Sequence, residues 1–132
     1  MKKILFLFAF IGILSACSSD DNSTASVTKA TLALKDASGQ SVSGITVYAY
    51  NQDTWEVIGD NPFFAEGQAV SDANGNAVFN NIEYGSSFND INNNQNTFRF
   101  SAHYTLGGTA KTKVTAITFT KGEQKTESVI LN

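Results

Sequence analysis

The chain has 132 residues, of which 42% are hydrophobic and 11% aromatic, with 9 basic and 12 acidic residues. This length predicts one domain with a single hydrophobic core. The formal net charge of −3 argues against a nucleic-acid partner, because binding to phosphates needs clustered lysines and arginines. One histidine and one cysteine are too few for the usual zinc sites, and we expect no cofactor.

The first residues have the pattern of an export signal. Lys2 and Lys3 precede an apolar run, residues 4–14, that is shorter than the roughly 20 helical residues needed to span a bilayer. We therefore expect a signal peptide over residues 1–16 that is cleaved and takes no part in the fold.

Leu14-Ser15-Ala16-Cys17 resembles the lipobox of bacterial lipoproteins. The resemblance implies that the thiol of Cys17 is acylated, that Cys17 becomes the first residue, and that the lipid anchors the protein to a membrane. The alternative is an ordinary small-residue cleavage site with a chance cysteine.

Residues 17–26 are polar and lack large apolar side chains, which predicts a flexible tether. Within them, residues 18–21 (SSDD) resemble the acidic signal that sends some Gram-negative lipoproteins to the outer face of the outer membrane. That resemblance implies a lipid-anchored protein of the bacterial outer membrane that faces the cell exterior. A generic solvated linker is the alternative.

Residues 27–132 are rich in Thr, Val, Ile, Phe, Gly and Asn and show no sustained helical spacing of apolar residues. The pattern predicts an all-β domain, a seven-stranded antiparallel β-sandwich. The clearest expected strands, in chain order, are Val27–Lys35, Ile45–Asn51, Asn76–Asn80, Phe98–Thr105, Thr109–Thr120 and Glu123–Leu131.

Two of these strands alternate clearly between two faces. In ITVYAYN, Val47 and Ala49 share one face and Tyr48 and Tyr50 the other. In FRFSAHYT the apolar face is Phe98, Phe100, Ala102 and Tyr104, and the other face is Arg99, Ser101 and His103. We expect His103 to face solvent.

Catalysis is not expected. A nucleophile must lie beside an activating base, and the only histidine is placed on a solvent-facing strand surface. A pair of carboxylates remains formally possible among the acids, but no pair stands in a recognisable spaced motif.

DASGQSVSG (36–44) and SDANGNAVF (71–79) are similar to the motifs of carboxypeptidase regulatory-like, or transthyretin-like, domains. The resemblance covers residues 28–131 and implies a small sandwich that accompanies enzymes, transporters and surface proteins without catalysing a reaction. The matching residues are Asp36, Gly39, Val42, Gly44, Ser71, Asp72, Gly75, Ala77 and Phe79.

Two long connections depart from the regular pattern. Ser86–Thr97 is rich in asparagine and is expected to be a solvated hairpin tip. Gln52–Val70 holds the only tryptophan, and such a long connection in a compact domain is often functional. Its aromatic and acidic residues could bind sugar rings or a basic peptide, or its aromatics could cover the sandwich. The candidate binding residues are Trp55, Phe63, Phe64, Asp53, Glu56, Asp60 and Glu66.

Asp72, Asn74 and Asn76 alternate as oxygen ligands do in calcium loops, but the glutamate expected further along is absent. They are weak calcium candidates, and turn formation explains Asp72 and Gly75 sufficiently.

The function expected from the sequence is therefore that of a non-catalytic surface lipoprotein. Its loops would recognise a glycan, a peptide or a partner protein. The alternative is a structural subunit that packs in an envelope complex through an exposed sheet edge.

Overall fold

The computed structural model describes residues 26–85, 87–88 and 94–132. The expected signal peptide, the lipidation residue Cys17 and all but the last residue of the expected tether lie outside the described residues. Within the described part there is no helix of the length and apolar character needed to cross a membrane.

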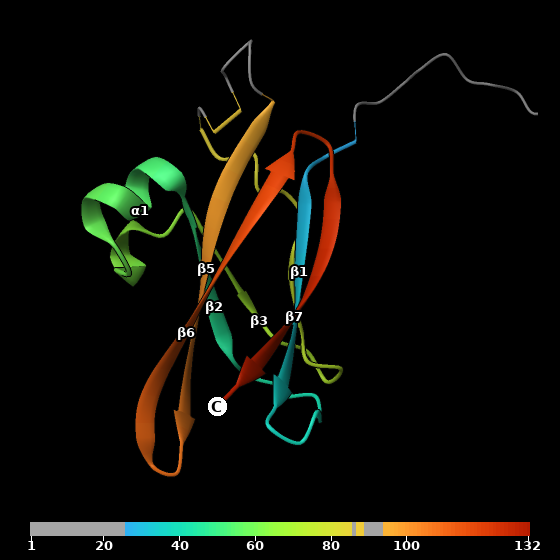
Figure 1. Ribbon diagram of the computed structural model, residues 1–132, viewed down its shortest axis with the longest axis vertical. Helices are drawn as coiled ribbons and strands as arrows, with labels where there is room; N and C mark the ends of the chain where they lie inside the picture. The colour runs from blue at the N-terminus through green and yellow to red at the C-terminus, as the bar shows by residue number, and fades with distance from the viewer. Residues whose placement is uncertain (1–25, 86, 89–93) are drawn as a thin grey trace, which may run out of the picture.

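Seven strands form two sheets, which confirms a two-sheet β-sandwich (Figure 1). One sheet has the strand order β4-β1-β7, and the other has the order β3-β2-β5-β6. The elements are β1 (Lys29–Asp36), β2 (Thr46–Asn51), helix α1 (Gln52–Ile58), the 3-10 helix η1 (Pro62–Phe64), β3 (Gly67–Val70), β4 (Asn76–Phe79), β5 (Gln95–Leu106), β6 (Thr109–Thr120) and β7 (Gln124–Leu131).

Three expectations need correction. Strands β1 and β7 pair in parallel, so the prediction of a wholly antiparallel sandwich is wrong for this pair. Parallel pairing needs a long connection, and almost the whole domain lies between these two strands. The segment Gln52–Val70 is no irregular loop, because it contains α1, η1 and β3. Strand β5 begins at Gln95 and not at Phe98, which takes the end of the expected Asn-rich tip into the sheet.

The core lies between the sheets and follows the predicted alternation. Val47 and Ala49 of β2 and Phe98 and Phe100 of β5 are fully buried. Their partners come from both sheets: the Phe79 ring of β4 lies 5.2 Å from the Phe100 ring, measured between centroids. Other buried apolar residues of the core include Leu32, Leu34, Ala77, Ile82, Phe88, Phe119, Val129 and Leu131.

The entry of the chain into β1 is fixed by Thr28, which is fully buried. Its N–H and its hydroxyl both donate to Oε1 of Glu83, at 2.9 and 2.8 Å, and its hydroxyl oxygen accepts from the N–H of Gly122 at 2.7 Å. The backbone and hydroxyl hydrogen bonds from Thr28 lower the pKa of Glu83 below its ordinary value. This contact therefore stabilises the fold above the ordinary glutamate pKa and is lost as the pH falls through the lowered one.

Two turns of the same sequence type lie at one end of the sandwich. In DASGQ, Oδ1 of Asp36 accepts from the N–H groups of Ser38 and Gln40. In DANGN, Oδ1 of Asp72 accepts in the same way from the N–H groups two and four residues further on. The glycine in each turn has a positive φ, 87° at Gly39 and 79° at Gly75. Each turn thus holds its shape by bonds to its own backbone.

Replacing each of these glycines with alanine separates backbone strain from close packing. A Cβ on Gly39 meets nothing within 4 Å, whereas a Cβ on Gly75 would lie 2.6 Å from the carbonyl oxygen of Leu34. We expect Gly39→Ala to lower the free energy of unfolding by about 1 kcal/mol through positive-φ strain alone. Gly75→Ala should cost about 2 to 4 kcal/mol. Urea denaturation measures both, and equal losses would contradict the packing argument.

Candidate functional site

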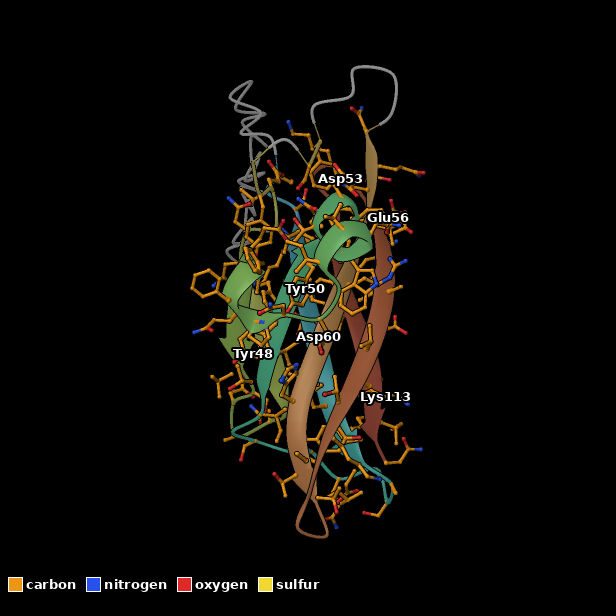
Figure 2. The ribbon with its side chains drawn as sticks, turned by 90° about the vertical axis from the view of Figure 1, so that its left-hand side faces the viewer. Tyr48, Tyr50, Asp53, Glu56, Asp60 and Lys113 are labelled. Atoms are coloured by element: carbon orange, nitrogen blue, oxygen red, sulfur yellow. The ribbon has the colours of Figure 1, made fainter. Side chains whose placement is uncertain are left out.

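The insertion, defined here as residues 52–64, lies over the outer face of the four-stranded sheet (Figure 2). Its helix α1 begins after Asn51, whose side chain accepts from the N–H of Thr54 at 2.8 Å and so satisfies a free donor of the first turn. The helix ends at Gly59, which has a φ of 74° and donates its N–H to the carbonyl of Trp55. Local signals therefore fix both ends of this short helix.

Glu66, one of the candidate binding residues, anchors the insertion to the sheet. Its Oε2 accepts from the N–H of Asn51 at 2.6 Å, and its Oε1 accepts from the hydroxyl of Thr54 at 2.5 Å. Both bonds hold the start of α1 against the chain that enters β3. The carboxylate of Glu66 is thus used inside the molecule.

Asp60 makes a second and larger polar connection. Its Oδ1 accepts from the hydroxyl of Tyr50 at 3.0 Å, and its Oδ2 accepts from the hydroxyl of Ser101 at 2.7 Å. Nε2 of His103 lies 3.0 Å from the same Oδ2. We call Asp60, Tyr50, Ser101 and His103 the Asp60 cluster; it joins the insertion to β2 and β5.

The Asp60 cluster is buried toward the sheet, at Tyr50 and Ser101, and partly open to water at Asp60 and His103. Tyr50 and Ser101 are fully buried, and the side chains of His103 and Asp60 are 34% and 23% exposed. Burial raises the pKa of Tyr50 above its ordinary value, and the hydrogen bond and negative charge of Asp60 add to the rise. The Tyr50 hydroxyl therefore remains a neutral donor to Asp60 at any physiological pH.

The residue types Ser101, His103 and Asp60 are those of a hydrolytic triad, but their geometry differs from one. In a triad the two imidazole nitrogens contact different partners, one the carboxylate and the other the serine. Here Nε2 of His103 lies 3.0 Å from Asp60 and also 3.1 Å from Oγ of Ser101. A carboxylate oxygen can only accept, so the contact between Nε2 and Oδ2 of Asp60 assigns the hydrogen to Nε2, and Nε2 in that tautomer has no lone pair to accept the serine's proton.

The aromatic residues of the insertion divide into two groups. The ring of Trp55 packs edge-on against the ring of Tyr50, with centroids 5.4 Å apart, so Trp55 covers the outer face of the sheet. Phe63 is 87% exposed and Phe64 is 46% exposed, and their rings meet edge to face at 5.1 Å. Val57 on α1 is 85% exposed. The insertion therefore both covers the sheet and presents large apolar side chains to solvent.

The acids of the candidate set divide in the same way. Asp53 and Glu56 lie on α1 and are exposed, whereas Tyr48, Tyr50 and Asp60 lie lower, over the strands (Figure 2). Gln52 donates its side-chain amide to Glu56 within the helix. The structure thus brings Phe63, Phe64, Asp53 and Glu56 to the surface and assigns Trp55, Asp60 and Glu66 to internal contacts.

Sequence reasoning placed His103 on the outer face of β5, and that face is confirmed. It missed that His103 contacts Asp60 and that its ring packs edge-on against Tyr48, 4.9 Å away. The faces opposite the apolar ones in ITVYAYN and FRFSAHYT carry hydroxyl and imidazole groups, which indicates a polar partner on that side of the sheet. Nothing local in the sequence identifies Asp60 as that partner, which bonds Tyr50, Ser101 and His103.

Among the weak calcium candidates, Asp72 uses one carboxylate oxygen within its own turn. Oδ1 of Asp72 accepts the N–H groups of Asn74 and Asn76, at 2.9 Å each, which is the turn-forming role. Within the described ranges, no three histidine, cysteine or acidic side chains gather where they could hold a metal ion.

Two of the hollows on the surface of the described residues are shallow and are lined by none of the candidate binding residues. One, of about 460 Å³, lies among Ser26, Val27, Glu83, Asn94, Lys121 and Gly122. Its carboxylate, Glu83, is already bonded to Thr28. The other, of about 300 Å³, lies beside the β5–β6 hairpin next to His103 and Lys111.

The sequence matches no protein-family model, and no curated protein is significantly similar to it.

The Asp60 cluster can be tested by replacing one carboxylate at a time. Asp60→Asn keeps the shape but leaves a single acceptor oxygen for three donors, and hydrogen bonds to a charged group are worth about 1.5 to 3 kcal/mol each. We expect a loss of about 2 kcal/mol in the free energy of unfolding. Asp53→Asn, on the exposed first turn of α1, is the control and should cost about 0.5 kcal/mol. Similar losses in both variants would show that Asp60 does not hold the insertion.

Proposed function

We propose that the protein is a lipid-anchored, non-catalytic binding module of the bacterial outer membrane, displayed toward the cell exterior. The proposal rests on the export signal, on the lipobox at Cys17 and on the exposed side chains of the insertion. The sandwich holds the insertion in place, and the insertion carries the binding surface.

The observation that carries the proposal is the exposure of large apolar side chains on one short insertion. Such groups are costly to leave in water, and exposed apolar surface marks interaction sites in soluble proteins. On the same insertion, Asp53 and Glu56 are exposed, and residues 36–98 contain no lysine or arginine. The large apolar residues are Val57, Ile58, Phe63 and Phe64.

These features favour a protein or peptide ligand over a glycan. A sugar ring stacks on the open face of an aromatic ring, and Trp55, the largest ring of the insertion, packs against Tyr50 instead. Aliphatic and aromatic side chains flanked by carboxylates suit an apolar segment with basic neighbours. We infer that the ligand is a peptide or protein segment of that composition.

The transthyretin-like resemblance is supported by contacts between its two motifs. The hydroxyl of Ser71 donates to the carbonyl of Val42 at 2.8 Å and accepts from the N–H of Ile45 at 2.9 Å. The N–H of Gly44 donates to the carbonyl of Ser71. The matching residues thus have a common structural role, and we propose that the sandwich is of this type.

A second candidate function is assembly with other envelope proteins through a sheet edge. It is favoured by β6, a strand of 12 residues that pairs only with β5 and has no strand on its other side among the described residues.

The binding surface is tested by comparing two aromatic substitutions. Phe63→Ala removes an exposed ring and should change the free energy of unfolding by less than about 0.5 kcal/mol, while it abolishes binding. Trp55→Ala uncovers Tyr50 and should cost about 2 kcal/mol. Binding is read by photo-crosslinking from position 57 on α1 in intact cells, with Phe63 present or replaced, and with position 126 on β7 of the other sheet as control. Crosslinked partners that are the same from both positions would contradict the site.

Lipidation is tested independently at Cys17. Only a thiol is accepted for acylation, so Cys17→Ser should abolish fatty-acid labelling and cleavage before residue 17, while the domain folds as before. Metabolic labelling and fractionation measure this. Label retained by the variant in the membrane fraction would exclude Cys17 as the anchor.

A further inference from the structure

Strand β6 is an edge strand, with β5 on one side and no strand on the other among the described residues. Backbone groups along a strand point alternately to its two sides. The N–H of Lys121, just after β6, donates to the carbonyl of Asn94 on the side of β5. The N–H of Thr120 points the other way and donates to Oε2 of Glu123 at 2.8 Å. The even-numbered residues of β6 therefore direct their backbone groups away from β5.

The outward side of β6 is covered only near the turn that leads to β7. There the carbonyl of Thr118 accepts from Nζ of Lys125 at 2.6 Å, and the backbone of Thr120 is bonded to Glu123. Closer to the β5–β6 hairpin, the outward backbone groups have no hydrogen-bond partner within the part of the chain that the structure describes. The residues that carry these groups are Ala110, Thr112, Val114 and Ala116.

We call residues 110–116 the open edge. At about 3.4 Å per residue it is roughly 20 Å long, which is the length of an ordinary strand. The hairpin that carries it projects beyond the end of β7 (Figure 1). The open edge is therefore long enough and accessible enough to accept one more strand.

Two lysines lie on the open edge, and neither is paired with an acid of the described residues. Lys111 is exposed, and Lys113 is half-buried at the margin of β6 (Figure 2). Nζ of Lys113 donates to Oδ1 of Asn132 at 3.4 Å, which is a neutral acceptor. The ion pairs of the described residues involve His103 and Lys125 instead. The open edge thus carries positive charge that the described chain does not neutralise.

The two lysines stand where cross-strand side chains come closest. A strand added to the open edge would bond the backbone groups of the even-numbered residues. In an antiparallel pair, Lys111 and Lys113 then occupy the non-hydrogen-bonded positions, whose Cα atoms lie about 4.5 Å from those opposite. Opposite charges at such positions stabilise the pair, and like charges destabilise it. The charge of the incoming strand therefore decides how well it pairs.

We propose that the open edge binds an extended acidic segment of another protein by strand addition, with acids of that segment opposite Lys111 and Lys113. Pairing of the edge with itself is disfavoured, because it brings the lysines of two copies together. Lysines on an edge strand also discourage pairing with strands that lack a compensating charge. The proposal rests on the second candidate function, assembly through a sheet edge, and names the class of partner.

The other face of the open edge adds to the description of the partner. The side chains of its even-numbered residues are exposed, and all are small or β-branched. Such side chains pack well against β-branched residues of a neighbouring strand. We therefore expect a segment in which acids alternate with residues such as valine, isoleucine and threonine.

The test is disulfide exchange between a cysteine on the open edge and synthetic peptides. The full-length chain with Val114→Cys, in a neutral detergent, is mixed with the peptide EVECEVE or KVKCKVK in a buffer of reduced and oxidised glutathione. Opposed residues of a hydrogen-bonded antiparallel pair lie about 5.5 Å apart between Cα atoms, within the range of a disulfide. With the peptide cysteine opposite position 114, charged peptide residues lie opposite Lys111 and Lys113.

The mixed disulfide should form with a several-fold higher yield from EVECEVE than from KVKCKVK. The difference should shrink as salt is added, because salt screens the charges. The wild-type chain controls for reaction at Cys17, and Ser43→Cys, in an exposed loop, controls for reaction without a strand edge.

Two further variants separate charge from strand pairing. Lys111→Gln together with Lys113→Gln should bring the yields of the two peptides close together, and it leaves the backbone alone. Thr112→Pro removes an N–H that points away from β5, so the β5–β6 ladder keeps all its bonds. The yield with EVECEVE should then fall, while the urea unfolding midpoint changes little.

The outcomes distinguish the partner class from edge assembly itself. Equal yields from the two peptides, both lowered by the proline, would overturn the acidic partner and leave assembly through the edge in place. A preference for EVECEVE that survives the proline would be charge attraction without strand pairing, and it would overturn both. Yields on Val114→Cys no higher than on Ser43→Cys would also overturn both.

Discussion

The side chains of strand β5 alternate between two faces of its sheet. One face packs in the core, and the other bonds a residue of the insertion. On one face Phe98 and Phe100 enter the core between the sheets. On the other face Ser101 and His103 bond the carboxylate of Asp60. A shift of one residue would put phenylalanines against Asp60 and a serine into the core, so the two faces fix the register together. The insertion can cover the outer face only because this register holds.

The residues of the insertion that contact the outer face of the sheet differ from those that face solvent. Trp55 and Asp60 reach the sheet and hold the insertion there, and Glu66, which follows the insertion in the chain, bonds its first turn. The residues that point away, such as Phe63 and Asp53, make no contact with the sheet. A binding surface built in this way can change its side chains with little effect on the sandwich, because the attachment residues and the exposed residues are different ones.

The sequence predicted the features that depend on neighbours along the chain. The alternation of Val47 and Ala49 with Tyr48 and Tyr50 gave the faces of β2, and Asp-Gly spacing gave both turns. The bounds of β6 agree with the prediction. The features that could not be predicted are contacts between residues far apart in the sequence. The contact of Asp60 with His103 joins two segments that carry no local signal for it. The parallel pairing of β1 with β7 joins the two ends of the domain. Helix α1 was not predicted because its residues are mostly exposed and form no apolar stripe. The cap at Asn51 is its main sequence signal.

The position of β1 determines how the domain responds to mechanical force. The described chain enters the sandwich at Thr28, which forms hydrogen bonds with Glu83 and Gly122. It continues directly into β1, the central strand of its sheet. A pull from the N-terminal side therefore acts along the axis of β1. To leave, β1 must slide past antiparallel β4 and parallel β7, so the hydrogen bonds along both neighbours are loaded together. An edge strand would instead peel away one bond at a time. Force applied from the N-terminal side is thus met by a central strand with hydrogen-bonded neighbours on both sides.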